Sequence, residues 1–404
     1  MDPHDHTTPE TFSFRLPGYI RNPYSFYPKF LSELPFFFNS QDNCYVVSRF
    51  DDVKHVLQEY KTFGSGSGVI PMRRDNPDDF GFNPIFMLSP PEQTRLRKLS
   101  ANAFSIAYTT SLQREISDIA ISILNDIERG SIFDLVERYA TRLTVLSLLR
   151  VISVSDQDTP YVCKLVMDII NGNDYSSNQD TAFMKDDPPA LALTKFLSAH
   201  IDRVRATRNG GFSAKLLDAD IAGDRLTANE LYGMFFVSLI AGTEDTIRAF
   251  ANVLLALWQH PDQKHMVLQD MDNLLADSIF EALRLYPTTH YLRRVVETDC
   301  ILCDTPVARG ASVVAVIGAA NRDERQFNEP NRFDIRRGNS RSSLSFGTGP
   351  HVCIGKNVAR LILTVGISEF LKKFPTYEID LASSRNVSRA MIIGYGNMPV
   401  HLPS

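Results

Sequence analysis

Near its C-terminal end the chain reads Phe346-Gly347-Thr348-Gly349-Pro350-His351-Val352-Cys353-Ile354-Gly355, a glycine-rich loop around a single cysteine. Glycine accepts positive φ without strain, so this backbone can turn sharply and come close to a flat partner. The apolar spacing of residues 357–365 predicts a helix, which places Cys353 just before a helix N-terminus. Unpaired N–H groups and the helix dipole favour an anion there and lower the pKa of a thiol. Cys353 is therefore a candidate metal ligand, and a small buried structural cysteine is the alternative.

The wider pattern around Cys353 indicates a family. Phe-Gly-x-Gly-x-His-x-Cys-x-Gly, followed by a helix that contains Ala359-Arg360, resembles the haem-binding signature of the cytochrome P450 family. The resemblance implies that Cys353 is the axial thiolate of a haem iron, where its electron donation favours O–O cleavage. It further implies that His351 contacts a haem propionate and that Phe346 packs beside the sulfur. The implied cofactor-binding residues of this loop are Phe346, Gly347, His351, Cys353 and Gly355.

Length and composition fit an ordinary globular protein. The chain has 404 residues, of which 44% are hydrophobic and 22% are charged, and its formal net charge is -5. A chain without a basic excess is not expected to bind nucleic acid. The five cysteines are scattered and odd in number, which does not suggest a disulfide framework.

Residues 1–20 contain no apolar run long enough for a signal peptide or a membrane anchor. The sequence therefore predicts a soluble, cytoplasmic protein that does not bind a membrane, which resembles the bacterial members of the family. We expect an N-terminal extension at 1–20, a single cytochrome P450 domain at 21–404, and a monomer.

A long helix is predicted from Thr227 to His260. Thr227-Ala228-Asn229-Glu230 is a capping box, and no proline follows until Pro261. Most of the side chains are apolar, so the helix should be buried on nearly all sides. In its middle stands Ala241-Gly242-Thr243-Glu244-Asp245-Thr246. Two adjacent acids in a buried helix need water, a partner or a chemical task, because unpaired buried charge is costly.

The same segment resembles the family motif Ala/Gly-Gly-x-Asp/Glu-Thr. The resemblance implies that Ala241 and Gly242 let the helix open over the haem iron, and that an acid and an alcohol relay protons to bound dioxygen. Glu244 matches the acid, whereas Asp245 stands at the alcohol position and Thr246 follows it, and these three are the catalytic candidates. Asp245 is a strong proton source only if burial or the adjacent Glu244 raises its pKa. Otherwise water delivers the protons, Thr246 substitutes, or the reaction uses peroxide or a substrate hydroxyl.

Two further segments resemble the family's haem-propionate partners. Pro90-Pro91-Glu92-Gln93-Thr94-Arg95-Leu96-Arg97 opens a helix with proline at its start. It resembles the family run Pro-Pro-x-His-Thr-Arg-Leu-Arg, in which the histidine and the last arginine grip the propionates. Arg97 matches that arginine, while Gln93 replaces the histidine and carries no charge. Arg294 matches a third propionate partner.

Glu281 and Arg284 form the second family signature, Glu-x-x-Arg. Their spacing puts both side chains on one face of a predicted helix, where they can form an ion pair. The resemblance implies a buried triad with the arginine of a Phe-Asp-x-x-Arg segment, here Arg337, with Arg336 as the alternative. Its role is structural, since it locks the core that holds the Cys353 loop.

A substrate cavity is expected behind residues 64–88, which lose periodicity and mix glycine and proline with bulky apolar groups. Such a loop covers a cavity or, alternatively, packs on the core. The polar segment 171–180 lies where the family has a mobile lid, and an ordinary surface loop is the alternative. Residues 69–86, with Ile392 and Ile393, suggest an apolar substrate of medium or large size. Thr288, Thr289, His290 and Asp245 suggest that it carries a polar or basic group. The candidate substrate contacts are Val69, Ile70, Phe82, Phe86, Ile240, Thr288, Thr289, His290, Ile392 and Ile393.

We predict a mainly α fold with a smaller β-rich lobe, in which non-covalent haem b lies between the 227–260 helix and the helix after Cys353. The implied enzyme is a haem-thiolate monooxygenase that inserts one oxygen atom from O2 into an apolar small molecule, by hydroxylation or epoxidation in secondary metabolism. Its electrons would come from a separate ferredoxin or flavodoxin and its reductase. The expected docking cations are Arg95, Lys98, Lys356, Lys372 and Lys373.

Two alternative functions stay open on the sequence. Because Asp245 replaces the usual threonine, the protein could be driven by peroxide, or could couple or desaturate its substrate oxidatively. Turnover with hydrogen peroxide, and none with dioxygen and a reductase, would favour that chemistry. The alternative from another class is a haem-binding sensor or carrier without turnover, which steady product formation would exclude.

Overall fold

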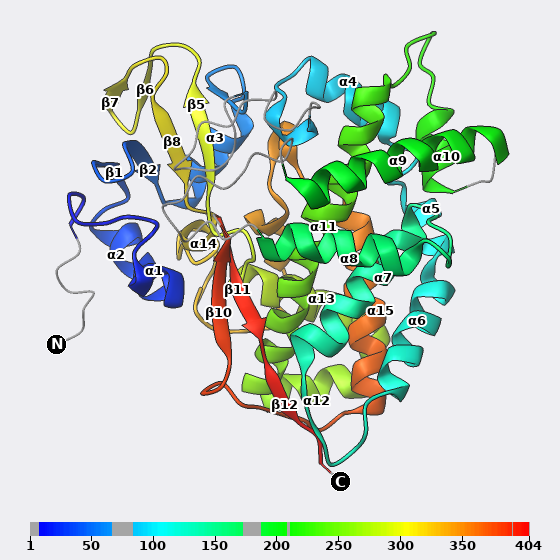
Figure 1. Cartoon of the computed structure of the whole chain (residues 1–404). Coiled ribbons are helices and arrows are strands. Elements are labelled where there is room, and N and C mark those ends of the chain that lie inside the picture. The colour runs from blue at the N-terminus through cyan, green and yellow to red at the C-terminus, as the bar shows by residue number, and fades with distance from the viewer. Residues whose placement is uncertain (1–7, 67–83, 173–186, 208–210, 390, 404) are drawn as a thin grey trace.

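The structure is a computed structural model that describes residues 8–66, 84–172, 187–207, 211–389 and 391–403. Helices form the larger part of the molecule, and most strands gather in a smaller lobe (Figure 1). The expected mainly α fold with a smaller β-rich lobe is therefore confirmed. Val69, Ile70 and Phe82 lie outside the described residues, as do positions 173–180 of the expected lid. In the described ranges, no helix combines the length and the apolar character that crossing a membrane requires.

The larger part is organised around the long helix α11 (Ala228–Gln259). Its capping box is confirmed, because Thr227 accepts from the N–H of Glu230 while the Glu230 carboxylate accepts from the N–H of Thr227. At a rise of about 1.5 Å per residue, its 32 residues extend about 48 Å. The other helices of this part are α4 (Glu92–Ser100), α5 (Ile106–Ser111), α6 (Gln113–Asn125), α7 (Arg142–Val151), α8 (Thr159–Gly172), α9 (Pro188–Thr207), α10 (Phe212–Leu217), α12 (Pro261–Gln269), α13 (Met271–Leu285) and α15 (Lys356–Lys373). Because α7, α8, α9, α13 and α15 all contact α11, they enclose it in the main hydrophobic core.

The β-rich lobe is built on a five-stranded sheet with the order β1-β2-β8-β5-β3. Strands β2 and β8 run parallel, and the other neighbouring pairs are antiparallel. The strands are β1 (Phe36–Asn39), β2 (Cys44–Val47), β3 (Phe63–Gly64), β5 (Leu292–Val296) and β8 (Ser312–Ala315), and the helices beside them are α1 (Pro17–Arg21), α2 (Tyr27–Ser32), α3 (Phe50–Gln58) and α14 (Ile317–Ala320). Val47, Val313 and Phe50 belong to a second hydrophobic cluster, which fixes α3 on this sheet.

Short strands near the C-terminus reach back to the helices. The β10 (Arg385–Arg389) and β11 (Ile392–Asn397) strands form an antiparallel hairpin, and β11 contacts α11 (Figure 1). This contact places residues 392–397 next to the long helix. The remaining strands are β4 (Ile132–Asp134), β12 (Pro399–His401) and β9 (Glu378–Ile379), paired in that order, and the hairpin of β6 (Cys300–Leu302) and β7 (Thr305–Val307).

Residues 8–20 lie against the β-rich lobe. Phe12, Phe14 and Tyr19 are buried there, with Phe12 packed on Phe30 and Phe14 packed on Tyr291. These rings join a third hydrophobic cluster with residues of the sheet. The domain boundary at residue 21 stays a prediction, but residues 8–20 contribute to the core rather than hang apart from it.

Candidate active site

The Cys353 loop owes its shape to glycine. Gly347 and Gly349 have φ values of 68° and 65°, which glycine takes without strain. At Gly349 space also excludes a side chain, because a Cβ there would lie 2.9 Å from the Cα of Gln58. The N–H of Cys353 donates to the carbonyl of Phe346 at 2.7 Å. The loop is thereby closed around Cys353 directly before α15 begins at residue 356.

The Cys353 side chain is accessible to a water-sized probe although it lies deep within the protein, so it faces an internal space. Burial raises the pKa of Cys353 to about 11, and the Asp245 carboxylate adds to this rise. The N–H of Gly355 and the charges of Arg97 and Lys356 oppose it. The expectation that the helix N-terminus lowers the pKa of Cys353 is therefore wrong for the protein alone, because desolvation outweighs the local donors. A bound metal cation is the kind of charge that would hold this sulfur as a thiolate.

The central part of α11 forms another wall of this internal space. Ala241 is exposed and Asp245 is partly exposed, although most residues of the helix after them are buried. The two are four residues apart, so they share one helix face. The Asp245 carboxylate on that face is near enough to Cys353 for its charge to raise the pKa of the thiol. A side chain at Gly242 would meet Leu148 of α7 at 3.4 Å, so Gly242 packs toward α7.

The Asp245 carboxylate is held by residues from outside α11. Its Oδ1 accepts hydrogen bonds from the hydroxyls of Thr288 at 2.5 Å and Thr289 at 3.1 Å. Burial raises the pKa of Asp245, while the two threonines and the charge of Arg248 partly offset that rise. The segment after α13 therefore anchors the acid that the sequence singled out. Nothing in the local sequence indicates this pairing, since the partners are more than forty residues away along the chain.

The other two catalytic candidates lie on different faces of α11. Thr246 is 4% exposed and stands four residues after Gly242, on the face directed to α7. Glu244 is half-buried one position before Asp245, a rotation of about 100° around the helix. The structure thus brings Asp245, but not Thr246, to the face of Ala241.

Arg97 and Arg294 form a cluster of positive charge around His351 of the Cys353 loop. Burial lowers the pKa of His351 to about 3, and the charges of Arg294 and Arg97 add to this effect. Burial also lowers the pKa of Arg294 to about 10. Arg97 donates to the carbonyl of Val352 at 2.7 Å, and no carboxylate of the described residues pairs with either arginine. A buried guanidinium at Arg294 and a half-buried one at Arg97, both without a carboxylate partner, fit an anionic ligand.

Two neighbours support this cluster. Gln93 donates its amide N–H to the carbonyl of Pro350, which ties α4 to the Cys353 loop. Its predicted propionate contact stays a prediction. The Ser65 hydroxyl lies 3.3 Å from Nε2 of His351, a contact that no sequence pattern indicated.

Glu281, Arg284 and Arg337 meet in the core behind the loop. Glu281 and Arg284 are fully buried, and the guanidinium of Arg284 donates to both carboxylate oxygens at 2.8 Å. Arg337 donates from Nε to Oε1 at 2.9 Å, so it rather than Arg336 completes the triad. Arg284 also donates to the carbonyls of Asn321 and Pro330. The network joins α13 to the chain that precedes the Cys353 loop.

A family model described as Cytochrome P450 matches residues 23–390. The chain belongs to the cytochrome P450 family. A protein named cytochrome P450 109 from Bacillus spizizenii is 30% identical over 353 residues, which cover 86% of this chain and 84% of that protein. Putative cytochrome P450 123 from Mycobacterium bovis is 26% identical and covers 99% of this chain and 96% of its own length. The structure of cytochrome P450 CYP109Q5 from Chondromyces apiculatus matches with a TM-score of 0.86 at 23% identity, over 97% of this chain and 98% of that one.

Family membership makes this cytochrome P450 a monooxygenase, an oxidoreductase. The family also implies a thiolate-ligated haem, and the residues present fit that cofactor. Cys353 opens into an internal space, opposite a helix face with a small residue at Ala241. The buried Arg294 and the half-buried Arg97 lack carboxylate partners in the described part of the chain, as sites for propionates require.

The expected substrate contacts of this P450 divide into two groups. Phe86, Ile240 and Thr289 are partly exposed, and Thr288 and Ile392 retain 8% and 9% exposure. Thr289 also forms a β-bridge with Ile392, so both stand beside Asp245. Contacts with Asp245 therefore support Thr288, Thr289 and Ile392, whereas the substrate contacts of Phe86 and Ile240 stay predictions.

His290 and Ile393 do not line the expected cavity. The ring of His290 is fully buried, its Nδ1 lies 2.5 Å from the hydroxyl of Tyr27, and it packs on Tyr24. Ile393 is 3% exposed and belongs to the aromatic cluster of the β-rich lobe. Successive residues of a strand point to opposite faces, so Ile392 and Ile393 cannot both face one cavity.

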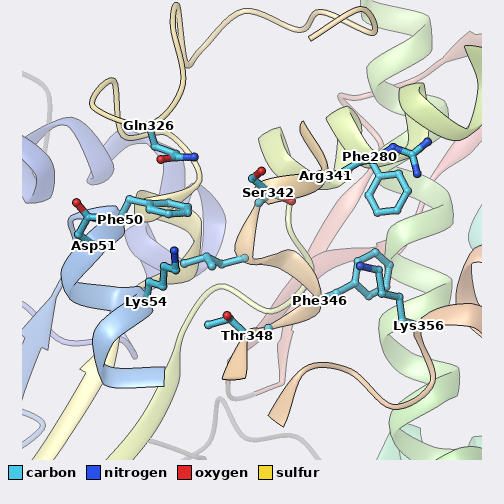
Figure 2. A pocket seen from close by; sticks show the side chains of 13 residues that line it. Phe50, Asp51, Lys54, Phe280, Gln326, Arg341, Ser342, Phe346, Thr348 and Lys356 are labelled. Carbon is cyan, nitrogen blue, oxygen red and sulfur yellow. The ribbon is translucent and has the colours of Figure 1, made fainter. Parts of the chain in front are cut away.

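A surface depression of about 340 Å³ borders the Cys353 loop. Figure 2 shows Lys54 and Phe50 on one side of it, and Lys356 beside Phe346 on the other. Arg341, Lys356 and Arg360 surround the ring of Phe280 at 4.7, 5.5 and 5.2 Å from its centroid. No sequence pattern indicated Arg341 and Arg360 as docking cations, because the chain before the Cys353 loop and α15 meet at Phe280 only in the fold.

The expected docking cations differ in their availability. Arg95 forms ion pairs with Asp224 at 2.7 Å and Glu230 at 2.5 Å, which commit its charge to linking α4 and α11. Lys372 pairs with Glu369 at 2.9 Å. Lys356 instead lies over two aromatic rings at the edge of the depression.

Proposed function

We propose that this cytochrome P450 binds non-covalent haem b between α11 and the Cys353 loop and inserts one oxygen atom from O2 into an apolar small molecule. One observation supports the proposal: the Cys353 side chain is accessible to a water-sized probe although it lies deep within the protein, and the charge of Asp245 on α11 acts on its sulfur. Thiolate-ligated haem iron supplies activation of dioxygen when it is bound. The residues of this chain hold the cofactor, orient the substrate and manage protons.

The proposed cofactor contacts follow from charge and space. Cys353 ligates the iron, and the N–H of Gly355 donates a hydrogen bond to its sulfur, which stabilises a thiolate. Arg97 and Arg294 bind the propionates, because charge-assisted hydrogen bonds would give both cations the anionic partner that they lack. Ala241 leaves room for a flat ring on the α11 side. Phe346, Gly347, His351 and Gly242 complete the proposed haem contacts.

Asp245 and Glu244 are the proposed proton-handling groups. The hydroxyl of Thr288 donates to Asp245 at 2.5 Å, so an acid and an alcohol stand together beside the haem space. In the family motif the alcohol belongs to the long helix, whereas here it comes from the segment after α13. This arrangement supports proton handling at the Oδ1 of Asp245 without a threonine at that position.

Separate redox proteins are the proposed electron source. Lys356 and Arg360 lie over the ring of Phe280 beside the Cys353 loop, whereas Arg341 on the same ring is paired with Asp277 at 2.6 Å. An acidic ferredoxin or flavodoxin could bind at the depression where Figure 2 shows Lys356, with its cofactor near the thiolate. An ionic partner of this kind should associate faster at low salt.

The proposed reaction is tested by isotope labelling. The haem-loaded enzyme is incubated with ¹⁸O₂, a reductase, a ferredoxin and a library of apolar small molecules, and products are read by mass spectrometry. One ¹⁸O atom per product molecule is expected. Products that take their oxygen from water, or no oxygenated product from any substrate, would count against the monooxygenase proposal.

Peroxide-driven chemistry is the second candidate, and the carboxylate at position 245 favours it. A fixed carboxylate near the oxygen-binding position can accept the proton that hydrogen peroxide must lose. Product formation with hydrogen peroxide and none with dioxygen and reductase would select this candidate over the first.

A further inference from the structure

The two oxygens of the Asp245 carboxylate are in different situations. Oδ1 accepts both threonine hydroxyls, from Thr288 and Thr289. Oδ2 accepts no hydrogen bond from the described residues, and it is not among the atoms sealed from a water-sized probe. The side chain is therefore fixed by one oxygen and presents the other to the internal space.

Asp245 also lacks a counter-ion among the described residues. Arg248, seven residues ahead in the chain, is the cation that acts on it, but Arg248 donates to the carbonyl of Tyr395 and forms no ion pair with the carboxylate. A carboxylate taken out of water without a partner is strongly destabilised. Two hydroxyl donors compensate part of that cost and favour the charged form. The charge of Arg248 acts in the same direction, and a cation bound at Oδ2 would add the direct ion pair that the carboxylate lacks.

The surroundings of Oδ2 define the rest of the ligand. Ala241 lies on the same face of α11, Ile240 is partly exposed beside it, and Ile392 bridges to Thr289. Ala241, by its shared helix face, and Ile392, through its bridge to Thr289, place apolar side chains near this fixed anion. A ligand that matches both features carries a positive charge at one point and is apolar elsewhere.

We propose that Asp245, fixed by Thr288 and Thr289, is a substrate-binding residue that anchors a cationic amine group of an otherwise apolar substrate. This inference rests on the proposed monooxygenase function and specifies its substrate class. Oδ1 remains with the threonines while Oδ2 pairs with the cation, so the anchor does not displace the acid and alcohol pair. Because the anchor lies beside the haem space, it orients the substrate as well as holding it.

The test compares one cation with its neutral isostere. Phenylpropyl-trimethylammonium has no lone pair on nitrogen, so it cannot ligate haem iron. Its isostere replaces the nitrogen by carbon and keeps the shape. Calorimetric titration of the haem-loaded enzyme gives both dissociation constants for wild type, Asp245→Asn and Asp245→Thr. Asp272→Asn is the matched control, because Asp272 is exposed and its substitution changes the net charge equally.

Wild type should bind the cation more tightly than its isostere. Both Asp245 variants should lose that preference by at least about tenfold, or about 1.4 kcal/mol. Asp272→Asn should keep it, and neutral-probe affinity should change little in any variant. An equal preference in wild type and both Asp245 variants overturns the inference, and so does a wild type that does not bind the cation.

The carbon monoxide spectrum of the same reduced samples separates the two claims. A thiolate-haem band without cation preference overturns the substrate inference and leaves the proposed function standing. Absence of that band overturns the proposed function, and the inference that rests on it falls too.

Discussion

Glu281→Gln should destabilise this enzyme strongly, because it removes the negative charge from a fully buried network. The Glu281 carboxylate accepts from Arg284 at 2.8 Å through both oxygens and from Arg337 at 2.9 Å, with the N–H of Asp334 at 3.1 Å. The amide that replaces one oxygen must point a donor at a guanidinium donor. It also leaves Arg284 and Arg337 without a counter-charge.

The expected loss follows from burial. Removing one partner of a buried ion pair costs about 3–5 kcal/mol, against a total stability of about 5–15 kcal/mol for a typical protein. The position of the Cys353 loop should also become less stable, because Arg284 donates to the carbonyls of Asn321 and Pro330 in the chain that precedes the loop. We therefore expect weaker haem retention together with easier unfolding.

Urea unfolding of the haem-loaded protein, followed by far-ultraviolet circular dichroism and by the Soret band, measures both effects. Glu329→Gln is the matched control, since its ion pair with Arg332 at 3.1 Å has side chains that are 60% and 61% exposed. That control should lose less than about 1 kcal/mol. A loss for Glu281→Gln no larger than that of the control would refute the reasoning.

Three further predictions address the loop, acid stability and the redox partner. Gly349→Ala should cost about 1–3 kcal/mol and reduce haem per protein molecule, because φ is 65° and the new Cβ would meet Gln58 at 2.9 Å. Gly338→Ala, with no atom within 4 Å of its Cβ, is the control, and equal haem contents would contradict the prediction. His290 has its pKa lowered by burial to about 3, so it stays neutral in the folded protein while the unfolded chain takes up a proton below about pH 6.5. The contribution of His290 to the free energy of unfolding is constant above that pH. It falls by about 1.4 kcal/mol per pH unit as the pH decreases toward 3. Urea titrations at several pH values should show that His290→Gln removes this part of the slope. Equal slopes for both proteins would show that His290 is not held neutral. Lys356→Glu should slow reduction by an acidic ferredoxin at least tenfold at low salt in stopped-flow measurements, whereas Lys372→Glu, at a lysine already paired with Glu369, should change it less. Similar rates for the two variants would exclude the cations around the ring of Phe280 as the docking site.

Local patterns in the sequence were sufficient for the features that depend on neighbours along the chain. The capping box at Thr227 fixes the start of α11, because its two hydrogen bonds join residues three apart. The spacing of Glu281 and Arg284 likewise places both on one face of α13. Gly349 could be singled out by type, although the close approach of Gln58 that excludes a side chain is visible only in the fold.

The features that sequence reasoning missed depend on distant segments. The hydrogen bonds of Asp245 with Thr288 and Thr289 join α11 to the chain after α13, and no periodicity reports them. The His290 side chain lies in the β-rich lobe, where its Nδ1 contacts the hydroxyl of Tyr27. The pKa of Cys353 rises rather than falls because burial, which depends on the whole fold, outweighs the local helix terminus.

The carbon monoxide difference spectrum of dithionite-reduced protein, for wild type and Cys353→Ala, tests the thiolate-haem assignment most directly. A strongly red-shifted Soret band in wild type, lost in Cys353→Ala, is the predicted result. Wild type that binds haem without that band, or a variant that keeps it, would contradict the assignment of Cys353 as the iron ligand.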